Sequence, residues 1–418
     1  MKLSTEPKLI YNKNKETIDF CFYFPIKTEY KNIHYVRLLD YILSTTSNNY
    51  PDSSEFEKAK KQKLLISNSI YLIPNEETSF IAYLFTIPKE NILKDYNIYE
   101  TFEFAISLIT NPYIENNRFN ENKFYYEKNY FVERNRLVMD NITNRMNEEF
   151  YSIIDKKEYL GCSYLNSTKT LENITPESLY EFYEKNIKEN KCLVYAYGNI
   201  KLKKLNYLFD KYYNRPNETL NIDIKNYKKV PDSKSINIIK SVPLEQSYIY
   251  LEYKVKNFTE EERIYLKIII GFLYGPENDL LFQKLRIEKN IIYSFSLIRY
   301  LNSGIFIIRA GLDEKNKNEF INSVNDVFDK LQDVKVIEEC LYKLIEGLKI
   351  NLLKEEDTNE FILKNTVADD LQMDTSKKYL EKCKGVRMNK IYEVLKKIEL
   401  KNIVFFRSTK WQKHIKKH

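Results

Sequence analysis

Histidine is the scarcest of the residue types in this chain that commonly bind metals or move protons. His34 stands alone, whereas His414 and His418 are four residues apart, as two ligands on one helical face would be. Those two lie in the basic stretch 410–418 and have no third ligand close in the sequence. We therefore expect no histidine-based zinc site and no histidine-based catalytic triad in this chain.

Glycine and cysteine exclude further chemistries. The eight glycines form neither GxGxxG nor GxxxxGK, and no serine lies in GxSxG, so the sequence lacks a dinucleotide fingerprint, a phosphate loop and a nucleophile elbow. The five cysteines are an odd number and include no CxxC pair, which is typical of a reducing compartment. We expect each of them to be a small buried hydrophobic residue: Cys21, Cys162, Cys192, Cys340 and Cys383.

Length and charge define the class of protein. The 418 residues suffice for at least two domains, and 66 Lys and Arg against 59 Asp and Glu give a net charge of only +7. No apolar run of membrane-spanning length is present, and the start of the chain has no signal-peptide core. We expect a soluble, cytoplasmic protein that binds neither membrane nor nucleic acid. The alternative, a nucleic-acid accessory factor, depends on the small charge excess and the basic stretch 410–418, and would show as affinity that falls with salt.

The same order of secondary-structure elements occurs twice along the chain. An alternating strand opens each half, at 18–24 and at 248–255, and a helix follows it. Each half then has a second short helix, a hairpin, long helical stretches and a closing helix and strand. Thr175-Pro176-Glu177 and Thr259-Glu260-Glu261-Glu262 are helix N-terminal signals. The predicted helical stretches include 33–43, 121–151, 280–289 and 337–353, and the second hairpin is predicted over 291–300 and 305–311.

This repetition predicts the fold class and the domain boundaries. We expect an α+β protein with two homologous domains, each a mixed, mostly antiparallel sheet covered by helices. The predicted domains are residues 1–225 and 236–418, and the polar stretch 226–235 is the predicted linker between them.

Two patches of sequence resemble the pitrilysin family of zinc peptidases. One runs from Ile174-Thr175-Pro176-Glu177-Ser178-Leu179 to Gly198-Asn199, and the other runs from Leu281-Phe282-Gln283-Lys284-Leu285-Arg286 to Ile292-Tyr293-Ser294. The resemblance implies two pitrilysin-like domains. In active relatives the second patch supplies an arginine and a tyrosine that contact the scissile peptide, here Arg286 and Tyr293.

The zinc motif of the family, HxxEH, is lost. By position it falls on Arg37-Leu38-Leu39-Asp40-Tyr41. Arginine stays protonated and only donates hydrogen bonds, so Arg37 cannot replace a histidine ligand. Asp40 would have no metal-bound water to activate, and neither Glu127 nor Glu133 on the later helix would have a metal to bind. The chain alone is therefore expected to be inactive as a peptidase and to hold no cofactor.

Some bacterial relatives work as heterodimers in which one subunit has the zinc motif and the other has the arginine and tyrosine. This chain resembles the second kind, which implies a zinc-binding pitrilysin-type partner and an unfolded peptide substrate, such as a precursor or leader peptide. Tyr293 would then donate a hydrogen bond to the oxyanion, and Arg286 would bind a substrate carbonyl. The alternative is a catalytically inactive peptide-binding or scaffold protein that kept the fold. In that case Arg286 is a solvated helix residue and Tyr293 a half-buried aromatic.

Overall fold

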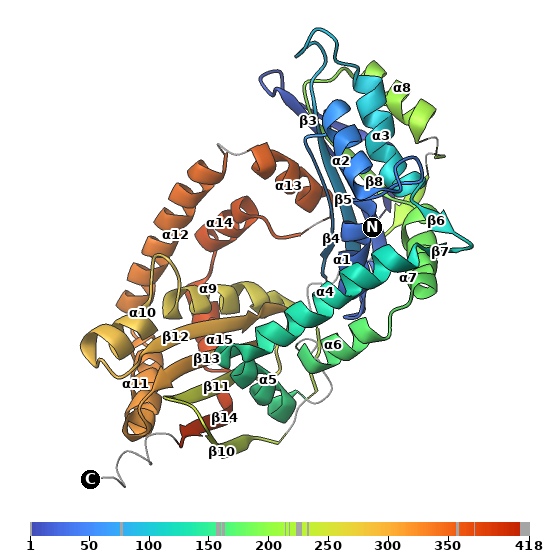
Figure 1. Ribbon diagram of the computed structural model, residues 1–418. Coiled ribbons are helices and arrows are strands. Elements are labelled where there is room, and N and C mark those ends of the chain that lie inside the picture. The colour runs from blue at the N-terminus through green and yellow to red at the C-terminus, as the bar shows by residue number, and fades with distance from the viewer. Residues whose placement is uncertain are drawn as a thin grey trace. The chain divides into compact units, whose positions relative to one another are not determined.

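The computed structural model describes residues 2–75, 78–155, 160, 164–213, 215–216, 218–222, 228–231, 234–356, 359–371 and 373–409. The described chain forms two compact units (Figure 1). The first comprises Met1–Met139, Cys162–Lys225 and Leu363–Gln372, and the second comprises Asp140–Gly161, Asn226–Ile362 and Met373–His418. Each unit thus includes one short segment from the opposite half of the sequence.

The first unit is built on a five-stranded mixed sheet. Its strand order is β2 (Lys8–Tyr11), β8 (Leu193–Gly198), β3 (Thr17–Lys27), β5 (Thr78–Pro88) and β4 (Ser67–Ile73), with β2 parallel to β8 and the other pairs antiparallel. Its helices are α1 (Asn32–Leu43), α2 (Ser53–Gln62), α3 (Ile98–Thr110), α4 (Glu121–Asp140), α6 (Tyr164–Glu172), α7 (Pro176–Tyr183) and α8 (Leu202–Tyr212). Two short ribbons pair β1 (Lys2–Ser4) with β9 (Thr219–Asn221) and β6 (Ile114–Glu115) with β7 (Arg118–Phe119).

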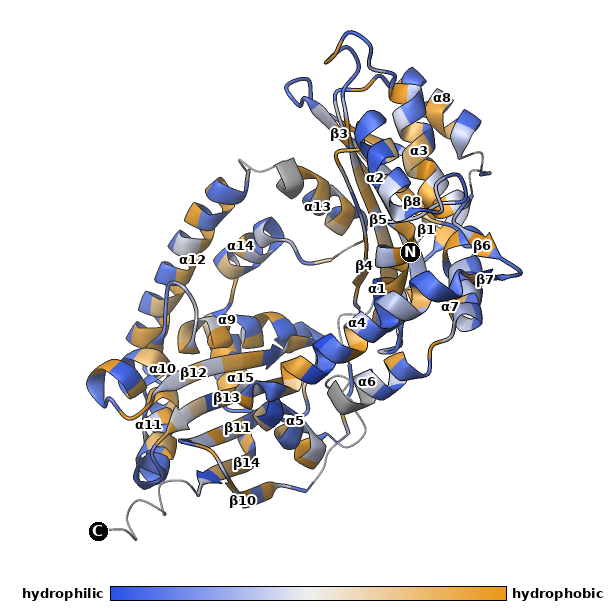
Figure 2. Ribbon diagram, in the orientation of Figure 1, coloured by the Kyte–Doolittle hydropathy of each residue, from blue (hydrophilic) through white to orange (hydrophobic). Residues whose placement is uncertain are grey.

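The core of the first unit follows from the alternation in β3. Phe20 and Phe22 point to the same face of the sheet, where Phe20 stacks on Phe85 with ring centroids 4.9 Å apart and meets Phe102 of α3 edge-to-face at 5.1 Å. Helix α7 begins where predicted, because Thr175 and Ser178 form a reciprocal capping box and Pro176 occupies the first helical position. In Figure 2 the helices carry alternating hydrophilic and hydrophobic bands, as expected for helices with one face in a core.

The second unit is built on a sheet of the same topology. Its strand order is β10 (Ile236–Val242), β14 (Ile398–Ser408), β11 (Ser247–Val255), β13 (Ile305–Leu312) and β12 (Ser294–Tyr300), with β10 parallel to β14 and the other pairs antiparallel. Its helices are α5 (Ile142–Ile154), α9 (Arg263–Leu273), α10 (Leu280–Phe282), α11 (Lys317–Lys330), α12 (Val334–Glu356), α14 (Ser376–Lys384) and α15 (Met388–Leu395). Helix α13 (Asn359–Asp370) has its residues from Leu363 onward in the first unit.

The two sheets confirm the predicted fold class. Position by position, β2-β8-β3-β5-β4 corresponds to β10-β14-β11-β13-β12, including the single parallel pair at one edge. The chain is therefore an α+β protein with two similar domains, each a mixed sheet with helices. Within the described residues, no helix combines the length and apolar character needed to cross a membrane.

Several predicted boundaries were wrong for local reasons. The helical stretch predicted over 121–151 is two helices, because Asn141 breaks it and caps α5 by accepting from the backbone N–H of Thr143 at 2.9 Å. The helix predicted over 280–289 is the short α10 followed by a π-helical turn, Gln283–Glu288. The edge strands β2 and β10 were not predicted, since one is short and the other follows the proposed linker.

The cysteine prediction is confirmed for the four described cysteines, Cys21, Cys192, Cys340 and Cys383, which are buried and unpaired. Cys162, His414 and His418 lie outside the described residues, as do 226–227 and 232–233 of the proposed linker.

Candidate functional site

Arg286 lies on a turn that the second core holds in place. Leu281 and Leu285 are fully buried one helical turn apart, so the segment Leu280–Glu288 is anchored by its apolar side and Arg286 faces outward. The turn ends at Asn290, whose φ of 50° reverses the chain. The Arg286 guanidinium then donates a hydrogen bond back to the carbonyl oxygen of Ile292.

Tyr293 is placed by the hairpin that follows this turn. Its backbone N–H donates to the carbonyl oxygen of Gly311 at 2.7 Å, which extends the pairing of β12 with β13 by one residue. Its side chain is 57% exposed, so the phenol is accessible to solvent. The prediction that Arg286 ends a helix and Tyr293 begins the next extended segment agrees with this geometry, although β12 itself begins at Ser294.

Asp313 joins this corner and was not foreseen. The Tyr293 hydroxyl donates a hydrogen bond of 2.9 Å to Asp313 Oδ2. That hydrogen bond raises the pKa of Tyr293 above its ordinary value, and the nearby Arg286 guanidinium acts weakly in the opposite direction. Asp313 follows β13 directly. The only feature of the sequence that could have pointed to its place beside Tyr293 is that it lies two residues after Gly311, at the end of the predicted hairpin. Arg286, Tyr293 and Asp313 thus form a polar corner with a protonated phenol beside a fixed positive charge.

The position of the lost zinc motif is filled by structural contacts. Arg37 points to solvent on α1, and the Tyr41 ring meets Phe131 of α4 edge-to-face at 4.9 Å. Asp40 Oδ1 accepts a 2.6 Å hydrogen bond from the backbone N–H of Ile70 on the edge strand β4. Burial raises the pKa of Asp40, and the Ile70 N–H opposes that shift. Asp40 therefore ties α1 to a sheet edge.

The acidic residues on α4 and the nearby histidine are engaged elsewhere as well. Glu127 is buried and pairs with Lys123 at 3.3 Å, and Glu133 accepts from Arg136 at 2.6 Å on the surface. His34 is buried on α1, and burial together with Arg37 lowers its pKa to about 4. No group of three or more His, Cys, Asp or Glu side chains that could hold a metal ion occurs in the part of the chain that the structure describes. The residues at the motif position do not fit zinc, because an arginine and a packed tyrosine replace both histidines.

Comparison with known proteins finds a family match over part of the chain. Residues 173–348 match the family described as "Peptidase M16 inactive domain". The "Probable inactive metalloprotease YmfF" of Bacillus subtilis (strain 168) is 20% identical over 380 residues, covering 89% of this chain and 88% of that protein. Both descriptions agree with the expectation that this chain alone is inactive, and they are compatible with a chain that holds no cofactor.

Two solved structures share the fold. A conserved protein from Enterococcus faecalis V583 has a TM-score of 0.81 at 19% identity, covering 97% of this chain and 98% of that chain. The periplasmic protease PqqL from Escherichia coli has a TM-score of 0.65 at 12% identity, covering 98% of this chain but only 47% of that chain. Residues 173–348 thus resemble the M16 inactive domain, and the chain is similar to a probable inactive metalloprotease and shares the fold of these two structures.

Proposed function

We propose that this chain is the non-zinc subunit of a two-chain M16 peptidase that cleaves unfolded peptides, such as precursor or leader peptides. A separate zinc-binding subunit of the same family would supply the metal and the general base. The observation that carries the proposal is the polar corner of the second unit, where Arg286 and the exposed Tyr293 come together although the zinc motif is gone.

The chemistry of this corner suits stabilisation of an oxyanion. Tyr293 has one hydroxyl proton, and its raised pKa keeps that proton in place at neutral pH. In the resting structure the proton is donated to Asp313, so the phenol has to turn from Asp313 to a substrate oxygen when a peptide binds. The Arg286 guanidinium stays charged and has donors beyond the one used by Ile292, and these could reach a substrate carbonyl.

The comparison with PqqL is consistent with this division of labour. This protein matches only 47% of the PqqL chain, so PqqL has a further half within the same polypeptide. We propose that a separate partner chain takes the place of the second half here. We also propose that the pair works in the cytoplasm and that residues 226–235 link domains 1–225 and 236–418.

The test requires a chain with an intact HxxEH motif, taken from neighbouring genes and co-expressed with this protein. Cleavage of an unstructured peptide is compared for the wild type, Arg286→Ala and Tyr293→Phe. Removal of one transition-state donor costs roughly 10²–10³ in rate, so either variant is expected to lose at least about tenfold. Arg387→Ala and Tyr342→Phe are matched controls, because both residues are exposed in the same unit and have no described side-chain partner. Full activity in both site variants, or in the zinc chain alone, would contradict the proposal.

A second candidate function is a catalytically inactive peptide-binding or scaffold protein. The observation that favours it is that two former chemical positions are already engaged: Tyr41 packs on Phe131, and Tyr293 donates its only proton to Asp313. A scaffold would still bind the partner chain and peptide, and the Tyr293→Phe variant would leave cleavage by the partner unchanged. The same set of variants therefore separates the two functions.

A further inference from the structure

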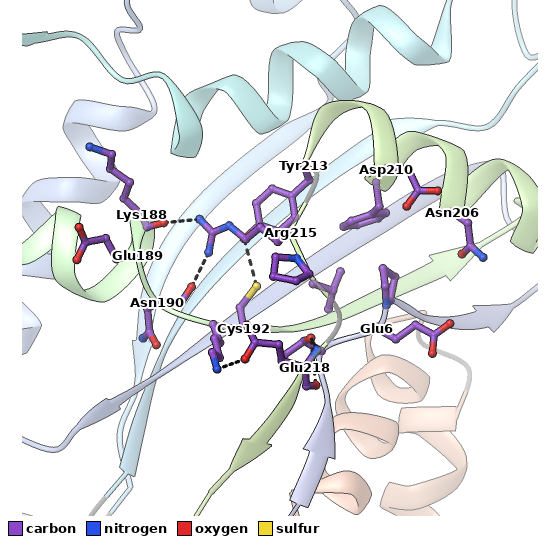
Figure 3. A pocket seen from close by; sticks show the side chains of 16 residues that line it. Glu6, Lys188, Glu189, Asn190, Cys192, Asn206, Asp210, Tyr213, Arg215 and Glu218 are labelled. Carbon is purple, nitrogen blue, oxygen red and sulfur yellow. Dashed lines mark hydrogen bonds and ion pairs between the residues drawn. The ribbon is translucent and has the colours of Figure 1, made fainter.

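The first unit contains a cavity of about 520 Å³ that the M16 comparison does not explain. It lies between the end of the π-helical turn Glu184–Lys188, strand β8, helix α8 and the segment that leads from β1 to β2 (Figure 3). Small-molecule sites usually enclose about 300–1,000 Å³, so the cavity is large enough for an organic ligand. It is separate from the Arg286 corner, which belongs to the second unit.

The positive charges that line this cavity are already neutralised or held. Arg215 donates to the carbonyl oxygens of Lys188 at 2.8 Å and Ile187 at 3.1 Å, and also to that of Asn190. Its guanidinium further stacks over the Tyr213 ring, 4.7 Å from the centroid. Lys188 pairs with Glu184 at 2.9 Å, and Lys191 pairs with Glu218. Lys188 and Lys191 are thus neutralised by carboxylates, whereas Arg215 keeps its charge but directs its N–H donors at backbone carbonyl oxygens.

Three carboxylates in the lining have no such partner. Among the described residues, the side chains of Glu6, Glu189 and Asp210 make no ion pair or hydrogen bond, and neither does the amide of Asn206. In Figure 3, Glu6, Asp210 and Asn206 lie at one end of the cavity and Glu189 lies at the other. The lining therefore has four carboxylates against three cations, a net formal charge of −1, and this negative balance favours a cation.

Part of the lining is apolar. Val194 and Phe209 are buried core residues that line the cavity, and Pro7 and Pro216 line it as well. Cys192 lies 3.2 Å from the Tyr213 hydroxyl, and burial raises the pKa of its thiol to about 11, so it presents a neutral sulfur. An aliphatic stem would bury apolar surface here while its charged end meets a carboxylate.

We propose that this cavity binds an alkylammonium group, a primary amine on an aliphatic stem. The amine could belong to a free diamine or to the lysine side chain of a peptide. The cavity, its unpaired carboxylates and its apolar residues together support this assignment, which is independent of the proposed peptidase role. Asp210 and Glu6 would receive the ammonium group, and the Phe209 surface would contact the stem.

The proposal is tested by calorimetric titration of the full chain with cadaverine and, in a second arm, with Nα-acetyl-lysine amide. Pentanol and hexanoate are the matched probes that lack the cation. Cadaverine is expected to bind with roughly millimolar or tighter affinity, and neither matched probe is expected to bind. Binding of cadaverine alone assigns the site to free diamines, whereas binding of both amines assigns it to lysine side chains as well.

Variants test whether the amine binds in this cavity. Glu6→Gln combined with Asp210→Asn is expected to weaken cadaverine at least about tenfold, because two charge-assisted contacts are lost. Glu57→Gln combined with Glu181→Gln, two exposed carboxylates elsewhere in the same unit, is the matched control. Asn206→Arg places a competing cation at the rim and should abolish binding without altering the core. Absence of amine binding, or binding that the Glu6 and Asp210 changes leave intact, would overturn the proposal.

Discussion

The stability of the first unit should depend on pH through a single buried histidine. His34 lies on α1 with only 2% of its surface exposed, one turn before Arg37. Burial disfavours the charged imidazolium, and the Arg37 charge adds to that effect, so the pKa of His34 falls from 6.5 to about 4 in the folded protein. Between about pH 4 and pH 6.5, the His34 imidazole is therefore neutral in the folded state and protonated in the unfolded state.

The sign and size of the effect follow from that difference. Because the pKa is lower in the folded state, stability is complete above about pH 6.5 and falls as the solution becomes more acidic. The loss in unfolding free energy is about 2 kcal/mol at about pH 5 and approaches about 3 kcal/mol below about pH 4. The reason is that each unit of pKa difference between the two states corresponds to about 1.4 kcal/mol. A loss of that size is a large fraction of the stability of a typical domain.

Urea unfolding of the wild type and His34→Gln at several pH values between about 7 and 4.5 tests this prediction. The glutamine stays polar but cannot bind the proton, so the difference in unfolding free energy between the two proteins should change with pH while the carboxylate contributions cancel. A difference that stays constant from about pH 7 to pH 5 would refute the reasoning, because His34 would then bind its proton equally in both states.

Three further predictions concern side chains that the fold brings together. Asp313→Ala should lower the pKa of Tyr293, because the hydrogen bond that raises it is removed; ¹³C NMR titration of labelled tyrosines measures the shift. Asp40→Ala should cost about 1–3 kcal/mol in urea unfolding and speed amide exchange in the edge strand β4, because the partly buried backbone N–H of Ile70 loses its acceptor. Gly304→Ala should lower the melting temperature, since φ there is +68° and a Cβ would lie 2.5 Å from the Phe258 ring.

Each of these predictions has a matched control. Asp329→Ala removes an exposed carboxylate from the same unit and should leave Tyr293 unchanged, so an equal shift in both variants would contradict the assigned cause. Asp40→Asn keeps an acceptor for the Ile70 N–H and should cost less than the alanine variant. Gly385→Ala has negative φ and no contact closer than 3.7 Å, and a loss matching that of Gly304→Ala would count against the steric argument.

The elements that the sequence predicts well are those with local causes. Thr175 and Thr259 lie at helix starts as predicted, where each forms a capping box, and Gly304 takes the left-handed conformation in the predicted second hairpin turn. The alternation along β3 and β11 marks strands because side chains two apart share a face. The break at Asn141 was missed because the helical periodicity continues across it, although its capping side chain was visible in the sequence.

The lost zinc site could also be concluded from residue types alone. An arginine at the position of Arg37 cannot bind zinc in any fold, so no tertiary structure was needed to exclude that ligand. The repeated order of elements predicted two similar domains because each half of the sequence has its own local signals for helices and strands.

Only the tertiary structure decided which side chains meet. Asp313 is 20 residues from Tyr293, Asp40 is 30 residues from Ile70, and Lys8 pairs with Asp370 across 362 residues at 2.8 Å. The cavity at Arg215 likewise depends on the N-terminal segment returning beside β9. Periodicity and capping describe neighbours along the chain, whereas these contacts depend on strand order, which hydrogen bonds between distant segments determine. The sequence by itself thus predicted two similar α+β domains and the replacement of the zinc-motif histidines, whereas the folding of each unit brought Asp313 to Tyr293 and gathered the charged residues around the cavity.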